Sequence, residues 1–393
     1  MQQLLRGYDK NVIPKGFRDP IRVAVEMTVQ DILNLDQTSG KFTMDLWFSQ
    51  IWKDHQLEYD HLNPCRTNLS LDHKTLESLW TPNVCFVNTK WTSIHTSPSP
   101  NVLLLLFPNG TVWLNYRVQV EGPCELDLSK FPMDVQECFL IFESYSYNNR
   151  EVSIHWANNS GLQPLTIDIN SIKIPDFNLI AYGVSKSEEM YTAGLWDQLV
   201  IRLTFNRRMG FYIIQAYVPT LTCVMMSWLS FFLDTTAVPA RMTLGVSTLM
   251  VLTFIFSNII NAGLPKVSYL RALDVWLVWQ GTMRRETPGN TSRMFACLFF
   301  TFLTMIELAI ANLVDKWWEA ADRRTTKEKL FQADTRLLLS RNPYAALQSP
   351  SLCRWRRRRQ NNGYKIDAWA ARLFPFAFIL FNCAYWYYYL VYT

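Results

Sequence analysis

Four long apolar stretches in the second half of the chain constrain its fold more than any other feature. A helix needs about 20 mostly apolar residues to cross a bilayer. Residues 211–233, 242–265 and 373–393 meet this requirement without a charged side chain, and residues 294–314 meet it with a single acid, Glu307. Soluble domains seldom bury helices of such length four times in one chain. The sequence therefore predicts four transmembrane helices.

The charges of the loops indicate how these helices are oriented. Residues 316–366 hold 13 basic side chains against four acidic ones. The positive-inside rule places such a segment in the cytoplasm, so the N-terminal half and the C-terminus are expected outside. The arginines at 354 and 356–359 also fit a patch that faces lipid headgroups without a specific role. A net charge of +5, spread along the chain, predicts no nucleic-acid partner.

The outer half, residues 1–208, has the pattern of a β-sandwich. β-rich segments at 22–29, 42–52, 102–107, 111–120, 137–144 and 199–206 are separated by turn-forming clusters such as Pro108-Asn109-Gly110. Acceptor sequons at Asn68, Asn109 and Asn158 agree with an extracellular, glycosylated domain. No signal peptide is visible in the first 15 residues. We predict a mixed fold, an extracellular antiparallel β-sandwich followed by a four-helix transmembrane bundle.

Two cysteines in the outer half enclose a short loop. Cys124 and Cys138 are separated by thirteen residues, with Phe131-Pro132-Met133-Asp134 in the middle. A disulfide that closes a loop of this length removes about 3 kcal/mol of denatured-state entropy in the usual treatment. Two cysteines at this spacing are a weak signal alone, and a strong one ahead of four membrane helices.

Further short motifs occur in order along the chain: Leu79-Trp80-Thr81-Pro82, the loop between Cys124 and Cys138, Glu143-Ser144-Tyr145, Arg207-Arg208-Met209-Gly210-Phe211-Tyr212, Pro239-Ala240-Arg241, Leu264-Pro265-Lys266-Val267-Ser268-Tyr269 and Phe374-Pro375. In these motifs the chain resembles the Cys-loop receptor family, the pentameric ligand-gated ion channels, over nearly its whole length. The resemblance implies a Cys124–Cys138 disulfide and a homo- or hetero-pentamer in a plasma membrane, postsynaptic or neuronal.

The second apolar stretch is the expected pore helix, residues 242–262. Residues three to four positions apart share one helix face, and this face carries hydroxyls at the cytoplasmic end, apolar side chains in the middle and polar groups at the outer end. Its members are Thr243, Ser247, Met250, Phe254, Ser257 and Asn261. The alternative is that this face forms only the polar seam of a packed bundle.

The charges at the ends of this helix indicate which ions it would pass. Cation pores carry carboxylate rings at their mouths. Here Ala240 and Arg241 stand at the inner mouth, so we expect five copies of Arg241 to favour chloride, as in the anion-selective branch that Pro-Ala-Arg resembles.

The family's transmitter site lies between neighbouring outer domains, and the resemblance implies two sets of residues. One face offers Cys85, Glu143, Ser144, Tyr145, Tyr191, Trp196 and Gln198, and the opposing face offers Trp47, Ser49, Asn115 and Arg117. Four aromatic side chains would form a box that holds an ammonium group by cation–π attraction. They are Tyr145, Tyr191, Trp196 and Trp47. The alternative for any one of them is simple packing at the sandwich edge.

The identity of the transmitter depends on an absence in the sequence. Family receptors for amino acids usually carry an arginine at the position of Ser49 to bind the carboxylate. We therefore expect a cationic amine, as in invertebrate amine-gated chloride channels, serotonin first and acetylcholine second. The alternatives are a GABA-gated channel that uses Arg117 and a non-conducting modulatory or adhesion subunit. The five histidines show no metal-ligand spacing, and no cofactor or enzymatic motif is apparent.

The predicted domain boundaries follow from these assignments. Residues 1–208 form the ligand-binding sandwich, 209–315 the first three transmembrane helices, 316–366 the cytoplasmic loop and 367–393 the fourth transmembrane helix. One departure from the family pattern is an insertion at 277–293, which contains the breaker pair Pro288-Gly289. We expect it to lengthen the outer loop or to break the third helix near the segment that normally transmits opening. Cys65 and Cys85 are expected either to pair with each other or to stay free.

Overall fold

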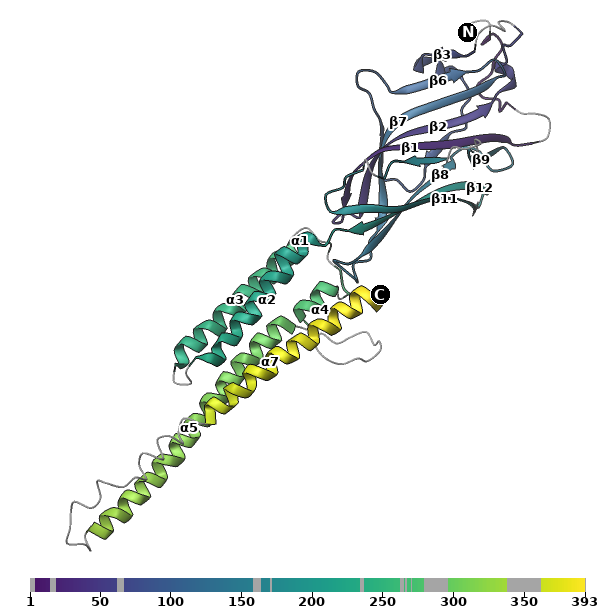
Figure 1. Cartoon of the computed structure of the whole chain (residues 1–393). Helices are drawn as coiled ribbons and strands as arrows, with labels where there is room; N and C mark the ends of the chain where they lie inside the picture. Colours follow the sequence, from purple (N-terminus) through teal and green to yellow (C-terminus); the bar gives the residue numbers. More distant parts are fainter. Residues whose placement is uncertain are drawn as a thin grey trace. The chain divides into compact units, whose positions relative to one another are not determined.

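The structure is a computed structural model that describes residues 4–14, 19–61, 67–157, 164–169, 172–233, 237–261, 265, 267–269, 271–278, 296–337 and 362–392 (Figure 1). The chain divides into two compact units. The first comprises Met1–Leu128, Asp134–Arg208 and Gly263–Lys266, and the second comprises Ser129–Met133, Met209–Ala262 and Val267–Thr393.

The first unit is a β-sandwich, as predicted from the sequence. Its main path of hydrogen-bonded strands runs β10-β1-β2-β7-β8-β12-β11. The strands are β1 (Ile21–Asp36), β2 (Lys41–Lys53), β3 (Leu69–Leu71), β4 (Val84–Phe86), β5 (Trp91–Ile94), β6 (Val102–Leu106), β7 (Thr111–Glu125), β8 (Val135–Ser144), β9 (Val152–Trp156), β10 (Leu165–Ile167), β11 (Phe177–Tyr191) and β12 (Gly194–Arg207). Short 3₁₀ turns lie at η1 (His55–Leu57) and η2 (His73–Ser78).

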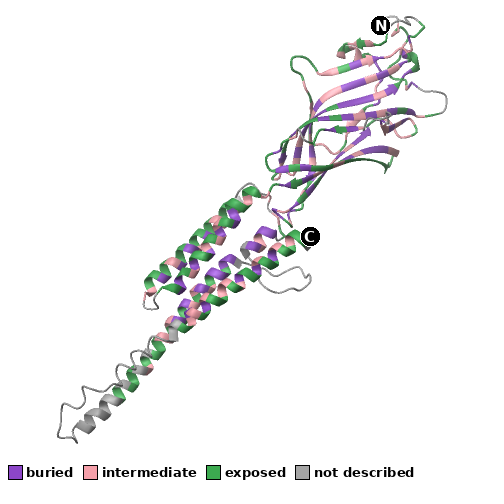
Figure 2. Cartoon of the chain, in the orientation of Figure 1, coloured by how far each residue is buried: buried purple, intermediate pink, exposed green. Residues whose placement is uncertain are grey.

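Alternation of side chains along the strands builds the core between the sheets. In β2, Phe42, Met44, Leu46 and Phe48 are buried in the core cluster, whereas Trp47 between them is exposed on the other face. Successive side chains of a strand point to opposite faces, so burial of one set fixes the direction of the other. Figure 2 shows the buried residues concentrated along the strands of the sandwich.

The sandwich differs from the sequence-based prediction in the direction of two strand pairings and in six strands that the predicted segments did not include: β3, β4, β5, β9, β10 and β11. β9 and β10 pair with β1 in parallel, whereas the remaining described pairs are antiparallel. β11 is the longest of these strands, with 15 residues, and it was missed because most of it is exposed and residues 185–189 form a polar run. Its pairing with β12 along nearly its whole length, rather than an apolar pattern, holds it in the sheet.

The loop between Cys124 and Cys138 is closed by the predicted disulfide. The two cysteines stand opposite each other where β7 pairs with β8. Inside the loop, Asp134 accepts two hydrogen bonds from the Arg207 guanidinium, at 2.6 and 2.8 Å, and both side chains are almost fully buried. The Arg207 guanidinium also lies over the Phe177 ring, 4.6 Å from its centroid. The end of β12 is therefore fixed to the loop by a desolvated ion pair.

Among its described residues, the second unit contains four helical segments long and apolar enough to cross a membrane, as predicted: Gly210–Phe232, Val238–Ile259, Cys297–Thr325 and Lys365–Val391. The first consists of α1 (Gly210–Tyr212), a π-helical turn (Ile213–Tyr217), α2 (Val218–Trp228) and a 3₁₀ turn (Leu229–Phe232). The others are α3 (Val238–Asn261), α5 (Ala296–Leu337) and α7 (Asn362–Tyr387), which ends in a π-helical turn (Tyr388–Tyr392). The π-turn precedes Pro219, which lacks the N–H that a regular α-helix would use.

The third membrane helix differs from the prediction at both ends. α5 continues to Leu337 instead of ending near residue 314, so the segment expected to be a loop from residue 316 begins as helix. Residues 316–337 contain neither proline nor glycine, so nothing in the backbone stops the helix where the apolar stretch ends. On the outer side, a separate short helix, α4 (Ala272–Val278), precedes α5. Of the insertion at 277–293, only Leu277 and Val278 lie within the described residues.

An aromatic cluster holds α4 against the bundle. The Trp276 indole donates a hydrogen bond to the Thr220 hydroxyl (3.1 Å), and the Cys297 thiol contacts the Trp276 carbonyl oxygen at 3.5 Å. The Tyr385 hydroxyl bonds the Ala272 carbonyl oxygen (3.0 Å) and lies 2.8 Å from the Tyr217 hydroxyl. Residues of α2, α5 and α7 therefore contact α4 on several sides, and the two pieces that flank the insertion pack together.

The buried ion pair in the cysteine loop leads to a stability prediction. Asp134→Ala leaves the Arg207 guanidinium buried without its counter-ion, which typically costs about 3–5 kcal/mol. We expect the detergent-solubilised full chain to aggregate at a clearly lower temperature and to reach the cell surface poorly. The matched control is Glu137→Ala, which removes the exposed pair with Arg202 at 4.0 Å and should cost about 1 kcal/mol or less. Equal losses in both variants would contradict this account.

Candidate ligand site and pore helix

The outward face of the sheet formed by β1, β2 and β7 carries two rows of aligned residues. Glu26 stands opposite Ser49, and Ser49 stands opposite Asn115. In the next row, Thr28 stands opposite Trp47, and Trp47 opposite Arg117. Directly opposed residues have Cβ atoms about 4.5–5.5 Å apart, so each row is a set of contacting neighbours. The register thus brings together all four residues predicted for this face.

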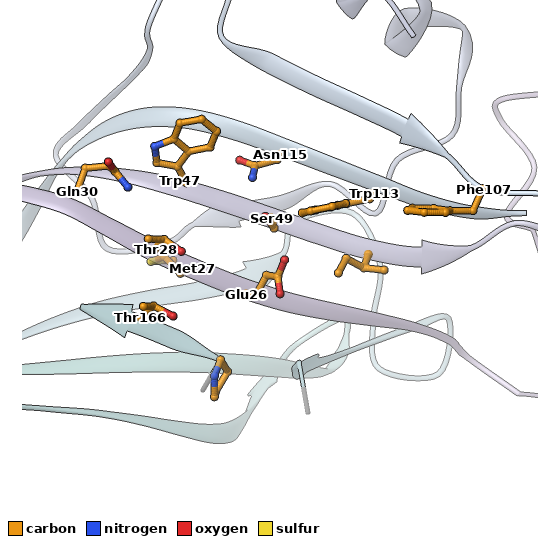
Figure 3. Close-up of a pocket in the computed structure, with 12 residues that line it drawn as sticks. Glu26, Met27, Thr28, Gln30, Trp47, Ser49, Phe107, Trp113, Asn115 and Thr166 are labelled. Carbon is orange, nitrogen blue, oxygen red and sulfur yellow. The ribbon is translucent and has the colours of Figure 1, made fainter. Parts of the chain in front are cut away.

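A pocket of about 590 Å³ lies over these rows (Figure 3). Its lining includes Trp47, Ser49 and Asn115 of the predicted set, together with Glu26, Thr28 and Trp113, which the sequence-based prediction missed. The volume lies within the range of small-molecule sites, roughly 300–1,000 Å³. Arg117 is not among the lining residues. The signal for Glu26 was present in the alternation of β1, where Val25 and Met27 are buried on either side of it.

Arg117 is bound to a carboxylate of its own sheet. Its guanidinium lies 2.6 Å from Asp45 Oδ2, and the other oxygen of Asp45 lies 3.1 Å from His95 Nε2. The hydrogen bond from Arg117 to Asp45, together with the carboxylate's charge, raises the pKa of the guanidinium, which stays fully charged. The positive charge on this face is therefore neutralised within the subunit.

The second predicted set of residues gathers around Glu143 at the end of β8. Gln198 Nε2 donates to Glu143 Oε2 at 3.0 Å, and the Tyr191 hydroxyl donates to the same oxygen at 3.2 Å. The Trp196 ring meets the Tyr191 ring edge-on, with centroids 5.6 Å apart. Desolvation, and then the charge of Glu143, raise the pKa of Tyr191, which remains a neutral hydroxyl at physiological pH. The Glu143 carboxylate thus lies beside the Tyr191 hydroxyl, next to the pair of aromatic rings.

Other members of this set lie at the edge of the cluster. Cys85 stands opposite Glu143 in the β4–β8 pairing, and burial followed by the nearby carboxylate raises the pKa of its thiol. Ser144 donates to the Pro82 carbonyl oxygen at 2.8 Å, so its hydroxyl has a structural partner. The Tyr145 side chain is 78% exposed and available to a ligand. Cys65 lies outside the described residues, and Cys85 is a free thiol.

A basic side chain on the same hairpin, Lys186, is also neutralised. Lys186 lies 2.7 Å from Asp197 Oδ2, and Ser153 donates to the same oxygen at 2.8 Å. Glu143 itself receives hydrogen bonds only from neutral groups in the part of the chain that the structure describes. Both predicted faces therefore present aromatic rings and a carboxylate, while their basic residues are engaged elsewhere. The two sets lie on different sheets of the sandwich.

The exposed and buried faces of α3 separate cleanly. Thr243, Ser247, Met250, Phe254 and Ser257, the row predicted to line the pore, are all exposed in the subunit. The opposite row contains Arg241, Gly245, Thr248 and Leu252, and all of these are buried. Ala240 is exposed in the first turn, and the side chain of Asn261 lies outside the described residues. The helix thus presents one continuous row of hydroxyl and apolar side chains to its surroundings.

Arg241 corrects the prediction of a ring of free positive charge at the inner mouth. Its side chain is only 1% exposed, and Nη2 lies 2.6 Å from Asp367 Oδ2 on α7. The guanidinium also donates to the Leu233 carbonyl oxygen at the end of the first membrane segment. The physical reason is rotation about the helix axis, because position 241 is about 200° away from position 243 at 3.6 residues per turn. Arg241 therefore fixes the inner end of α3 within its own subunit.

Two of the three predicted glycosylation sites lie among the described residues. Asn68 and Asn109 are exposed, and Asn109 stands in the turn that Gly110 completes with a positive φ of 79°. Asn158 lies outside the described residues. Within the described part of the chain, no group of three or more potential metal ligands occurs.

These features together define a class of protein. A β-sandwich carries two aromatic and acidic sites on its outer faces, and a separate bundle of membrane helices contains one helix with a continuous exposed row. This is the organisation of a membrane receptor that couples ligand binding to a transmembrane path.

Comparison with known proteins identifies the family. Residues 1–209 match the neurotransmitter-gated ion-channel ligand binding domain, and residues 216–281 match the neurotransmitter-gated ion-channel transmembrane region. The chain belongs to this family, whose members are ion channels with an extracellular ligand-binding domain and not enzymes.

Its relatives include anion channels of a nematode. The acetylcholine-gated chloride channel subunit acc-1 of Caenorhabditis elegans is 35% identical over 433 residues, covering 98% of this chain and 87% of that protein. The serotonin-gated chloride channel mod-1 of the same organism is 42% identical over 80% of this chain and 60% of its own length. The human gamma-aminobutyric acid receptor subunit rho-3 is 28% identical over 98% of this chain and 86% of that protein.

The two faces of α3 lead to a prediction about water access. In Ser247→Cys and Met250→Cys, a water-soluble methanethiosulfonate reagent should react with the new thiol and change the agonist current, because these positions belong to the exposed row. Thr248→Cys and Leu252→Cys are the matched controls on the buried row and should not respond. The unsubstituted chain is measured alongside, because Cys223 and Cys383 are not fully buried. Reaction confined to positions 248 and 252 would reverse the assignment of the pore face.

Proposed function

We propose that this chain is a subunit of a pentameric chloride channel that a small cationic amine opens. The transmitter would bind where the face of one subunit that carries Tyr145, Tyr191 and Trp196 meets the face of its neighbour that carries Trp47. The protein would act in the plasma membrane of a neuron, with the sandwich outside the cell. The observation that carries this proposal is the charge arrangement of the two faces.

Each face favours a cation over a carboxylate. Glu143 lies beneath the Tyr191–Trp196 pair, while Lys186 is engaged by Asp197. On the other face, Glu26 lines the pocket, and Arg117 is held by Asp45 outside the lining. An ammonium group between these faces meets ring faces and carboxylates, and each attracts it. An amino-acid transmitter would need a free guanidinium for its carboxylate, and Arg117 would first have to leave Asp45.

The amine assignment agrees with the relatives. Two of the nematode channels are named for acetylcholine and serotonin, and each is at least 35% identical to this chain. Gating by gamma-aminobutyric acid, as the name of the human relative indicates for that protein, remains the second candidate. A subunit that binds amine without conducting would show the same outer faces.

Selectivity for chloride has support that does not involve the Arg241 side chain. No carboxylate belongs to the exposed row of α3 within residues 238–259, and the first turn presents Pro239 and Ala240. The N-terminus of a helix carries a partial positive charge of about half an elementary charge. Five such termini around an axis would favour an anion at the inner mouth, while the guanidinium charge of each subunit is compensated by Asp367.

Reversal potentials test this account of selectivity. Agonist current in oocytes should reverse near the chloride equilibrium potential and shift when external chloride is replaced by a large impermeant anion. In the double variant Arg241→Gln/Asp367→Asn, which removes both charges of the buried pair, the reversal should still follow chloride. A double variant that conducts sodium would show that Arg241 sets selectivity after all. Reversal at the sodium potential in the unsubstituted channel would refute chloride selectivity itself.

The aromatic pair gives a test of the transmitter class. Trp196→Ala should weaken amine binding by roughly tenfold, about 1.4 kcal/mol, and Trp196→Phe should weaken it less because a ring face remains. Binding is measured by radioligand competition beside the half-maximal concentration for current, since gating contributes to the latter. Tyr182→Phe, on the same hairpin but outside the cluster, serves as the control. A response to gamma-aminobutyric acid with none to serotonin or acetylcholine would favour the second candidate.

A further inference from the structure

We propose that Glu26 and Asn115 form an acceptor pair that selects amines carrying N–H groups, and that the chain therefore prefers a protonated primary or secondary amine over a quaternary ammonium. This inference rests on the proposed amine-gated function and specifies the chemical class of its ligand. Glu26 is then a specificity-determining residue on β1, a strand that contributed nothing to the predicted site.

The charge of the pocket comes from one side chain. Among the described residues that line it, Glu26 is the only ionisable one. It takes part in no ion pair among the described residues, whereas the nearby Arg117 is committed to Asp45 at 2.6 Å. Glu26 is partly buried, so its carboxylate is less screened by water than one on an open surface. The pocket therefore has a net negative charge with no cation of its own.

Position relative to Trp47 allows one ammonium to contact both groups. Glu26 stands directly opposite Ser49, and Trp47 stands opposite Thr28, two residues further along the same face. Glu26 and Trp47 are thus diagonal neighbours, about 7–8 Å apart on a sheet. Cation–π contact extends to about 6 Å from the ring centroid, and a charged hydrogen bond spans about 2.8 Å. An ammonium nitrogen fits between the carboxylate and the ring.

Two buried polar atoms of the pocket have no partner and indicate what the ligand must supply. Asn115 is 9% exposed, and its Oδ1 accepts no hydrogen bond among the described residues. Trp113 Nε1 is a buried donor without an acceptor in the same part of the chain. Unsatisfied buried groups cost stability and are rare in folded proteins. Both side chains line the pocket, so a ligand that brings one donor and one acceptor would satisfy them.

The acceptor Asn115 Oδ1 separates the classes of amine. Asn115 and Glu26 flank Ser49 on its two sides, so they present two acceptors to the same space. Figure 3 shows the three side chains on adjacent strands of this face. A primary ammonium can donate to both acceptors and still face Trp47. A quaternary ammonium has no N–H. It would be attracted to the Trp47 ring and to the Glu26 carboxylate, but it would leave the Asn115 Oδ1 acceptor without a hydrogen bond. A hydroxyl or carbonyl elsewhere in the ligand would accept from Trp113.

A matched pair of ligands tests the inference on the full-length channel. Serotonin and its N,N,N-trimethyl analogue have the same ring system and charge and differ in their N–H donors. In the unsubstituted channel, serotonin should compete for the site at least tenfold better than the trimethyl analogue. Glu26→Gln should weaken serotonin binding by about ten- to a hundredfold, as expected for loss of a charge-assisted hydrogen bond, and weaken the analogue less. Asn115→Leu should abolish most of the preference between the two.

Controls separate specificity from folding and from general charge. Glu121→Gln removes an equal charge from the same sheet and should leave the preference unchanged. Glu121 is paired with Lys41 at 2.8 Å and is not among the residues that line the pocket. Surface biotinylation verifies that each variant is folded and exported, and Glu26→Asp, which keeps the charge, should recover part of the affinity.

The outcomes distinguish this inference from the proposed function. Equal binding of both ligands to the unsubstituted channel, or a preference unaltered by Glu26→Gln and by Asn115→Leu, would overturn the acceptor pair while amine gating stands. Binding of neither amine by the unsubstituted channel would overturn the proposed function and this inference with it.

Discussion

The register between β1, β2 and β7 is the constraint on which the ligand-binding unit depends. Phe42, Met44, Leu46 and Phe48 must lie in the core, and a shift of one residue would expose all four and bury Trp47. Because burial of the apolar set leaves one register, the outward rows through Ser49 and Trp47 are fixed as a by-product. The residues of the proposed ligand site thus obtain their positions from the buried side chains of the core. The rigid scaffold under the site is the hydrophobic core itself.

Arginine with aspartate recurs at the points where the fold needs a fixed charge. Arg207 with Asp134 fixes the cysteine loop, Arg117 with Asp45 neutralises the outer sheet, and Arg241 with Asp367 joins two membrane helices. The planar guanidinium suits such pairs because it can meet both carboxylate oxygens at once. The two pairs that are almost fully desolvated are expensive to break. Each of these guanidinium groups is therefore neutralised by an aspartate of its own subunit and contributes little net charge to bind a ligand or an ion.

Much of this organisation could be predicted from the sequence because it has local causes. The four membrane segments follow from apolar length, and β1, β2, β7, β8 and β12 follow from alternation and turn residues. The disulfide required the family resemblance in addition. β11 was missed because its stability comes from pairing with β12 and not from its own pattern. The helical continuation to Leu337 was missed because hydropathy marks where a membrane ends, whereas a helix ends only where its backbone is stopped.

The site was predictable to a different degree on each face. Family motifs supplied Glu143, Tyr191, Trp196 and Gln198, which the structure brings into one cluster. Alternation along β1 indicates that Glu26 points outward, but its position opposite Ser49 depends on the pairing of β1 with β2, a long-range register that cannot be read from the sequence alone. The burial of Arg241 was implied by helical spacing from Thr243, but its partner Asp367 lies 126 positions away and could not be inferred locally.

The pair between Arg241 and Asp367 also restrains one end of α3. It joins the first turn of α3 to the beginning of α7, while the guanidinium is bonded to the end of the first membrane segment as well. The inner end of α3 is therefore a fulcrum, whereas further along the helix Met250 and Phe254 are exposed and make no such tether. A tilt of α3 has a small lever arm at the fulcrum and a large one at the opposite end. In the pore proposed above, such a tilt would accordingly displace Met250 and Phe254 more than the first turn of α3.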